Sequence, residues 1–168
     1  MSTWDLFFYD GLASLIAESL QEGRGKEILI QHAKENMTKL RKFSADAPEN
    51  YLNKACLLEA ELAVVCNNKS EAISNFQRAI ELSSKHNFLH EEAIFCERAA
   101  MFYIQVGFIQ QATQSLLQSY NCFKKWGAIA KLKNLHVKFP TINFDSSAPL
   151  EINMEVEGHS TASISMLS

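Results

Sequence analysis

A 40-residue internal repeat constrains the fold of this 168-residue chain more than any other feature. When "AELAVVCNNKSEAISNFQRAI" is aligned with "AMFYIQVGFIQQATQSLLQSY", Ala60 falls on Ala100 and Ala72 falls on Ala112. Small residues at such positions let two antiparallel helices approach closely, and the bulkier residues between them fill the remaining space. The repeat therefore predicts two similar helical hairpins, one after the other.

Hydrophobic residues recur with helical period from the N-terminus to Phe139, and no segment alternates with period two for long enough to predict a convincing strand. Gly23, Pro48 and Pro140 mark boundaries, because glycine and proline interrupt helices. The predicted helices comprise one that contains Trp4 to Leu20 and others over roughly 26–43, 48–66, 69–86, 88–107, 109–125 and 128–138. Asn87 is the expected N-cap of the helix that carries Glu91 and Glu92.

This order of elements predicts an all-α fold of about seven helices, stacked as a right-handed solenoid of the tetratricopeptide (TPR) kind. Such repeats usually have a period of 34 residues, so a period of 40 implies longer helices or longer connections. Two hairpins cannot cover their own apolar faces. We therefore expect the first two helices to supply a third layer and the last helix to serve as a cap.

Residues 1–140 form the predicted helical repeat domain, and residues 141–168 form a predicted Ser/Thr-rich, acidic linker or tail that we expect to be disordered or weakly structured. Within the tail, "LEINMEVE" alternates weakly and is the one segment that an edge strand would suit. Six basic and no acidic side chains lie between residues 98 and 144, whereas residues 145–168 carry four acidic and no basic ones. This asymmetry favours an acidic partner, or the acidic tail itself, along a basic edge.

Three stretches resemble a known family: "APENYLNKACLLEAELA", "AISNFQRAIELSSKHNFLHEEAIFCERAAMFYIQVG" and "WGAIAKLKNLHVKFP". They are similar to the helical region of very large signalling kinases. Those proteins join a serine/threonine-kinase-like domain, a predicted ATPase, this helical region, a GAF domain and often a histidine kinase. The resemblance covers about residues 1–140, and it implies a fragment or isolated descendant of the middle region. The kinase and ATPase domains are absent from this chain, so those activities are not implied for it.

Several motifs suggest catalysis, but none of them has the spacing that a catalytic site requires. "GRGK" at Gly23 is too short for a phosphate loop, and His90-Glu91 lacks the second histidine of a zinc motif because Ile94 stands there. His32 invites comparison with a histidine phosphotransfer bundle. On a helix, however, Lys34 projects away from it, and Glu35 would repel a phosphoryl group. We expect no enzyme activity, cofactor or metal ion, and keep phosphotransfer through His32 as the alternative function.

The four cysteines show no CxxC pair, and each lies in an apolar helical context. We expect them to be reduced and buried, as in a cytoplasmic protein. The N-terminal apolar run has no preceding positive charge and is interrupted by Asp5 and Asp10, so it is neither a signal peptide nor a membrane span.

The predicted partner is a protein or peptide, including neighbouring domains of the same polypeptide, and not a membrane. A concave groove between repeats would be lined by the first helix of each hairpin, with candidate contacts at Asn53, Glu59, Glu61, Glu97, Arg98 and Tyr103. The possible basic edge consists of Lys124, Lys125, Lys131, Lys133 and Lys138. On a helical wheel, Lys131 and Lys138 flank one side of an apolar stripe and Lys133 flanks the other. This arrangement favours a capping helix over nucleic-acid binding, which remains a further alternative.

Overall fold

The computed structural model describes residues 3–17 and 23–144, and within them it contains seven α-helices and no strand. The helices are α1 (Thr3–Ala17), α2 (Arg24–Asp46), α3 (Pro48–Val65), α4 (Lys69–Lys85), α5 (Leu89–Val106), α6 (Ile109–Trp126) and α7 (Ile129–Lys138). The predicted all-α fold is confirmed. From α2 onward, the helix ends lie within a few residues of those expected from the sequence.

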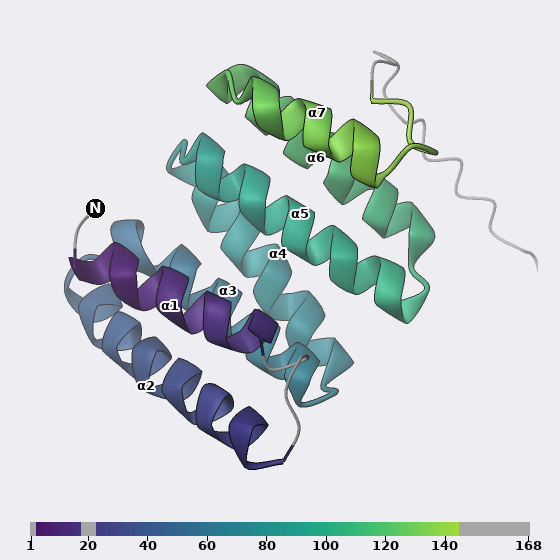
Figure 1. Ribbon diagram of the computed structural model, residues 1–168. Helices are drawn as coiled ribbons and strands as arrows, with labels where there is room; N and C mark the ends of the chain where they lie inside the picture. Colours follow the sequence, from purple (N-terminus) through teal and green to yellow (C-terminus); the bar gives the residue numbers. More distant parts are fainter. Residues whose placement is uncertain (1–2, 18–22, 145–168) are drawn as a thin grey trace, which may run out of the picture.

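Successive helices pack as three hairpins, α1 with α2, α3 with α4 and α5 with α6, and α7 packs on α6. In Figure 1, α1, α5 and α7 follow one another in the near layer, whereas α3, α4 and α6 lie behind them. Each hairpin also contacts the next, through α2 with α3 and through α4 with α5. As a result α3 is enclosed on most sides, and nine of its side chains are buried.

The connections repeat every 20 residues. Asn67, Asn87, Gly107 and Gly127 all have positive φ, of 56°, 58°, 84° and 80°. This left-handed conformation ends a helix and suits glycine and asparagine best. The expectation that Asn87 caps α5 is wrong, because Asn87 instead ends α4 and the N-cap of α5 is Phe88. Gly127 makes the turn before α7.

The 40-residue repeat is present in the packing of the core. Ala60 and Ala100 are both 0% exposed, in corresponding positions of α3 and α5. Ala72 and Ala112 occupy the matching positions of α4 and α6, and both are buried. A buried residue, Phe76 in α4 and Leu116 in α6, fills the space beyond each of these alanines, and Ala79 and Ser119 complete the match. Alanine-sized contacts thus recur from one hairpin to the next, as the sequence predicts.

The last helix covers the third hairpin with one side and presents the other side to solvent. Leu135 is fully buried, whereas Val137 is 81% exposed and Lys133 is also exposed. After α7 the chain returns to α6, where the buried ring of Phe144 stacks on Tyr120 at a centroid distance of 4.9 Å. Packing therefore continues to Phe144, four residues beyond the predicted domain boundary. The expected edge strand and the rest of the predicted tail lie outside the described residues.

None of the described helices is both long enough and apolar enough to span a lipid bilayer.

Candidate interaction surfaces

The side chains predicted to line a groove separate into three places in the structure. Glu61, Glu97 and Arg98 take part in ion pairs between helices, together with Lys54, Glu91, Lys131 and Lys138; we call these seven residues the charge network. Asn53 is buried beside the network, and Glu59 forms a pair with α2. Tyr103 lies on another side of α5, between α4 and α6.

The strongest link in the charge network joins α3 to α5. Arg98 donates from Nε and Nη2 to the two carboxylate oxygens of Glu61, and the Nη2–Oε2 distance is 2.8 Å. The side chains are only 22% and 7% exposed. Burial alone would lower the pKa of Arg98, but hydrogen bonding to Glu61 and the carboxylates of Glu61 and Glu97 raise it above its usual value. Arg98 is therefore charged, and its charge is satisfied within the protein.

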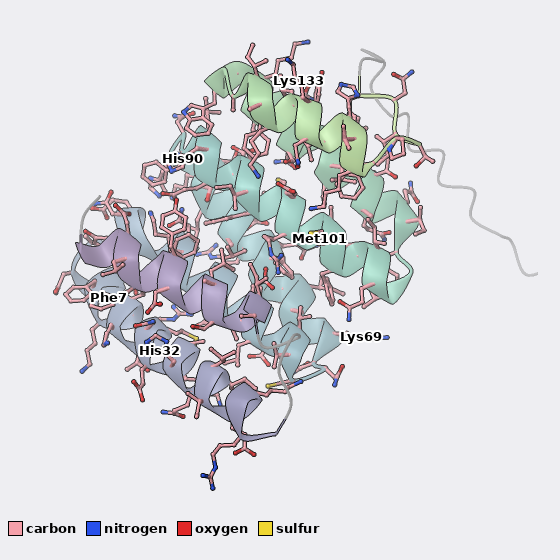
Figure 2. All side chains as sticks on the ribbon, viewed as in Figure 1. Phe7, His32, Lys69, His90, Met101 and Lys133 are labelled. Atoms are coloured by element: carbon pink, nitrogen blue, oxygen red, sulfur yellow. The ribbon has the colours of Figure 1, made fainter. Side chains whose placement is uncertain are left out.

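A second link joins α5 to the capping helix α7. Glu97 accepts hydrogen bonds from Lys131 at 3.3 Å and from Lys138 at 3.0 Å. Met101, labelled in Figure 2, lies one turn along α5, and its sulfur is 3.4 Å from Lys138 Nζ. Two of the five lysines of the predicted basic edge are therefore paired with an acidic side chain of α5.

A third link lies near the first turn of α5. Lys54 of α3 is 2.6 Å from Glu91, and the other carboxylate oxygen of Glu91 accepts a hydrogen bond from Asn53. Asn53 also donates to Ser83 of α4 at 3.0 Å. All four side chains are buried, so this cluster joins three helices and leaves Asn53 no surface for a partner.

Glu59 lies apart from the other predicted groove residues. It accepts two hydrogen bonds from Arg41 of α2, and these raise the pKa of Arg41 against the opposing effect of burial. The pair connects the first hairpin to the second. The sequence analysis placed Glu59 and Glu61 together on the groove face of the first helix of a hairpin, but Glu59 pairs with α2 and Glu61 pairs with α5.

Tyr103 belongs to a groove of about 520 Å³ between α4 and α6, which we call the glutamine groove. From α6 it is lined by Gln111, Gln114, Ser115 and Gln118, and from α4 by Gln77, Ile80, Glu81 and Ser84. In each helix these positions follow the spacing i, i+3, i+4 and i+7, which places them on one face. Two such faces, turned toward each other, form the walls.

Tyr103 completes this groove from α5. Its side chain is 6% exposed, and among the described residues none makes a hydrogen bond with its hydroxyl group. Burial, and to a smaller extent the thiol of Cys96, raise the pKa of Tyr103 above its usual value. The hydroxyl is therefore neutral at physiological pH and available as a hydrogen-bond donor in the groove.

Of the remaining lysines of the predicted basic edge, Lys124 and Lys125 lie on α6, and Lys133 is exposed on α7. Lys124 and Lys125 lie in the last turn of α6, where positive charge interacts favourably with the helix dipole. Lys131 lies 5.4 Å from the centre of the Phe123 ring, and Lys138 lies at the same distance from Phe139. Both lysines therefore lie beside aromatic rings as well as beside Glu97. Nucleic-acid binding would instead need several unpaired cations along one face.

His32 is tied to α1 through both ring nitrogens. Its Nε2 is 3.2 Å from Asp10 Oδ2 and its Nδ1 is 3.3 Å from Ser14 Oγ (the imidazole is labelled in Figure 2). Asp10 also accepts a hydrogen bond from Asn36 at 2.9 Å, which fixes the carboxylate beside the ring. A phosphoryl group on His32 would have to displace one of these contacts and lie beside a negative charge, so this geometry does not favour phosphotransfer.

Ser14, His32 and Asp10 have the composition of a Ser-His-Asp triad, but they lack the geometry that a hydrolase requires. Ser14 is buried and donates its hydroxyl proton to the carbonyl oxygen of Asp10, one turn earlier. Because the serine lies inside a helix, the neighbouring amides are engaged in helical hydrogen bonds and form no oxyanion hole. The cluster is best described as a polar contact within the first hairpin.

Three of the four cysteines are buried, and Cys66 is exposed, so the expectation that all four are buried is wrong. Burial raises the pKa of the Cys96 thiol, and burial together with Glu92 raises that of Cys122 to about 11. Both thiols are therefore protonated at neutral pH and poor nucleophiles. Among the described residues, no group of three or more His, Cys, Asp or Glu side chains is arranged to hold a metal ion.

The sequence did contain a signal for the glutamine groove. Gln111, Gln114 and Gln118 lie on one face of a helix whose apolar residues lie on another, so they can be read as a polar stripe. A single sequence does not show that a stripe on α4 faces this one. The two stripes are 34 residues apart, so they do not align with each other in the 40-residue repeat.

Comparison with known proteins shows a partial similarity to a signalling protein. Over 117 residues the chain is 32% identical to the hybrid signal transduction histidine kinase G of Dictyostelium discoideum. The match covers 69% of this chain but 3% of that protein. No protein-family model and no solved structure matches. The similarity supports a signal-transduction context for the chain.

Proposed function

We propose that this chain is a non-catalytic, TPR-like helical repeat module of a multidomain signal-transduction kinase, where it acts as a scaffold for protein contacts. Its partners would be proteins or peptides, including neighbouring domains of the same polypeptide, in the cytoplasm. The similarity to hybrid signal transduction histidine kinase G supports the context. The right-handed solenoid and the relation to serine/threonine kinases belong to the same proposal.

One observation carries the scaffold role: consecutive hairpins are joined by ion pairs as well as by apolar contacts. Glu61 with Arg98 links the second hairpin to the third, and Glu97 links the third to the capping helix. Buried charge pairs fix the register between helices more than they add net stability. A module that must hold other domains at a fixed spacing benefits from such a fixed register.

A set of overlapping fragments that together cover hybrid signal transduction histidine kinase G tests this proposal. Each fragment is titrated against the immobilised full chain, with an unrelated fragment of the same net charge as control. We expect at least one fragment to bind with a Kd below about 10 µM, as in transient interfaces between domains. If no tile binds at about 100 µM, the scaffold role in a kinase of this kind is excluded.

The proposal also predicts the outcome for phosphotransfer. After incubation with acetyl phosphate, the full chain should carry no acid-labile phosphate. Acid-labile phosphate that is lost in His32→Gln would establish the alternative function instead. His90→Gln provides the matched control, because His90 also lies next to an acidic side chain, Glu91, at 3.7 Å.

A further inference from the structure

We propose that Asp10, Ser14 and His32 form a proton-sensitive contact between α1 and α2. This contact holds α1 in place more firmly when the imidazole of His32 carries two protons than when it carries one. Such a device operates within the fold, whichever partner the module binds.

Both ring nitrogens of His32 face oxygen atoms of α1 (Figure 2). Nε2 is 3.2 Å from a carboxylate oxygen of Asp10, which only accepts hydrogen bonds while it is ionised. Nδ1 is 3.3 Å from the hydroxyl oxygen of Ser14, whose own proton is donated to the main-chain carbonyl oxygen of Asp10 at 2.8 Å. All three hydrogen bonds exist together when both ring nitrogens donate, and that requires the imidazolium form.

The neutral imidazole cannot keep all three hydrogen bonds. It carries one N–H group, so when Nε2 donates to Asp10, Nδ1 becomes an acceptor. The hydroxyl of Ser14 must then turn toward His32 and give up the carbonyl oxygen of Asp10. Deprotonation thus removes one hydrogen bond, together with the positive charge that faces the Asp10 carboxylate.

Asn36 holds the Asp10 carboxylate in position for this contact. Its Nδ2 donates, at 2.9 Å, to the same oxygen of Asp10 that faces His32. Its Oδ1, by contrast, is buried and has no hydrogen-bond partner among the described residues. A buried oxygen without a partner costs free energy, so the orientation of the amide is set by its bond to Asp10. The carboxylate therefore accepts from two donors, as its ionised form allows.

The charges that surround His32 on α1 and α2 are mainly negative. On α2, Glu27 and Glu35 line the same surface hollow as His32. The 15 residues of α1 include Asp5 and Asp10 but no lysine or arginine. Lys39 lies two turns further along α2, and its ammonium group is over the ring of Phe7 at 4.6 Å. Nearby carboxylates favour the charged form of an imidazole.

Helix α3 packs on both α1 and α2. Its charged side chains are Glu49 in the first turn, and Lys54, Glu59 and Glu61, which pair with Glu91, Arg41 and Arg98. Among the described groups at this contact, His32 is the one whose side-chain type ordinarily titrates near neutral pH.

The position of α1 decides how much of the core is covered. Phe8, Leu12 and Leu15 of α1 are buried, and the ring centroid of Phe8 is 5.9 Å from that of Phe95 in α5. Release of α1 would therefore uncover apolar surface of α3 and α5. The docked state binds the additional proton more readily than the released state, so docking weakens as pH rises through the range in which histidine titrates.

The test is hydrogen–deuterium exchange of the full chain at about pH 5.5 and about pH 8, corrected for the intrinsic effect of pH on exchange. Protection of α1 in the wild type should be about threefold higher at the lower pH, as expected for a partly exposed ion pair with one additional hydrogen bond. In His32→Gln and in Asp10→Asn the difference should fall below about 1.5-fold, because the ion pair is absent at both pH values.

His136→Gln is the matched control. His136 also contacts a hydroxyl group, that of Tyr120 at 3.4 Å, but it lies on α7, at the far side of the molecule from α1 (Figure 1). This variant should keep the threefold difference in the protection of α1. Far-UV circular dichroism establishes that each variant is folded, and Asp10→Asn provides the test from the other helix if His32→Gln does not fold.

Three results would overturn the proposal: equal corrected protection of α1 at both pH values in the wild type, protection that increases with pH, or the same loss of pH dependence in His136→Gln as in His32→Gln. If α1 exchanges only when the whole chain unfolds, chemical denaturation at the two pH values takes the place of exchange. The threefold difference should then appear in the unfolding equilibrium of the wild type relative to His32→Gln. Binding of kinase fragments, which tests the scaffold role, is a separate measurement.

Discussion

Two sides of helix α5 illustrate opposite uses of polar side chains. On one side Glu97 and Arg98 pair with α7 and α3, so their charges are satisfied inside the molecule. On another side Tyr103 lies at the base of the glutamine groove with a hydroxyl that has no partner among the described residues. The comparison shows that charge does not by itself mark a binding surface.

The largest effect is expected where one member of a buried pair is removed. Glu61→Leu leaves the Arg98 guanidinium in a largely buried position without its carboxylate, and this should lower the free energy of unfolding by about 3 kcal/mol. Chemical denaturation followed by circular dichroism measures the loss.

The matched double variant separates pairing from packing. Adding Arg98→Met to Glu61→Leu replaces the whole pair with apolar side chains, and stability should return to within about 1 kcal/mol of the wild type. If the single and double variants are equally destabilised, then Glu61 contributes through packing and the pair does not organise this side of α5.

The next effect concerns Glu97 and is smaller, because its partners reach solvent. The side chains of Lys131 and Lys138 are 46% and 37% exposed, so both ammonium groups can be hydrated when the carboxylate is lost. Glu97→Gln should therefore cost only about 1 kcal/mol. The same denaturation measurement at low and high salt checks this value, and the difference from wild type should shrink as salt is added. A loss as large as that of Glu61→Leu would contradict the distinction between a buried and a hydrated pair.

The sequence predicted the helices and the repeat because both follow from local rules. Ala60 and Ala100 could be aligned from the sequence alone, since the size of a residue and its place in a helical period are visible there. The left-handed turns at Gly107 and Gly127 are local in the same way, whereas Asn87 was misassigned because asparagine suits both an N-cap and a left-handed turn.

The surfaces could not be derived in this way, because they depend on contacts between distant helices. The sequence grouped Tyr103 with Glu97 and Arg98, but it does not specify how far α5 is rotated between α4 and α6. Nor does it reveal that Lys131 and Lys138, 34 and 41 residues away, meet the same carboxylate of Glu97. Pairing partners are set by tertiary packing, which helical periodicity constrains only in part.

A further prediction uses the raised pKa of Tyr103 at alkaline pH. In the unfolded chain the tyrosine ionises near its usual pKa, whereas in the folded protein burial keeps it protonated to higher pH. The folded state then binds more protons, so stability falls as pH rises from the unfolded pKa through the folded one. Denaturation of wild type and Tyr103→Phe between pH 9 and 11 should give a steeper decline for the wild type. Equal slopes would show that the Tyr103 side chain is not desolvated in the folded protein.

The smallest effect is expected for Tyr103→Phe at pH 7, and it completes the contrast between the two sides of α5. The change removes only the hydroxyl, which has no hydrogen-bond partner among the described residues, so no internal contact is lost. The free energy of unfolding should change by less than about 0.5 kcal/mol, because the hydroxyl reaches solvent in the groove and its loss leaves no buried group unpaired. Thermal denaturation monitored by circular dichroism is sufficient to detect a larger change. A loss above about 1 kcal/mol would mean that the hydroxyl takes part in an interaction inside the fold, and the contrast between the two sides of α5 would then fail.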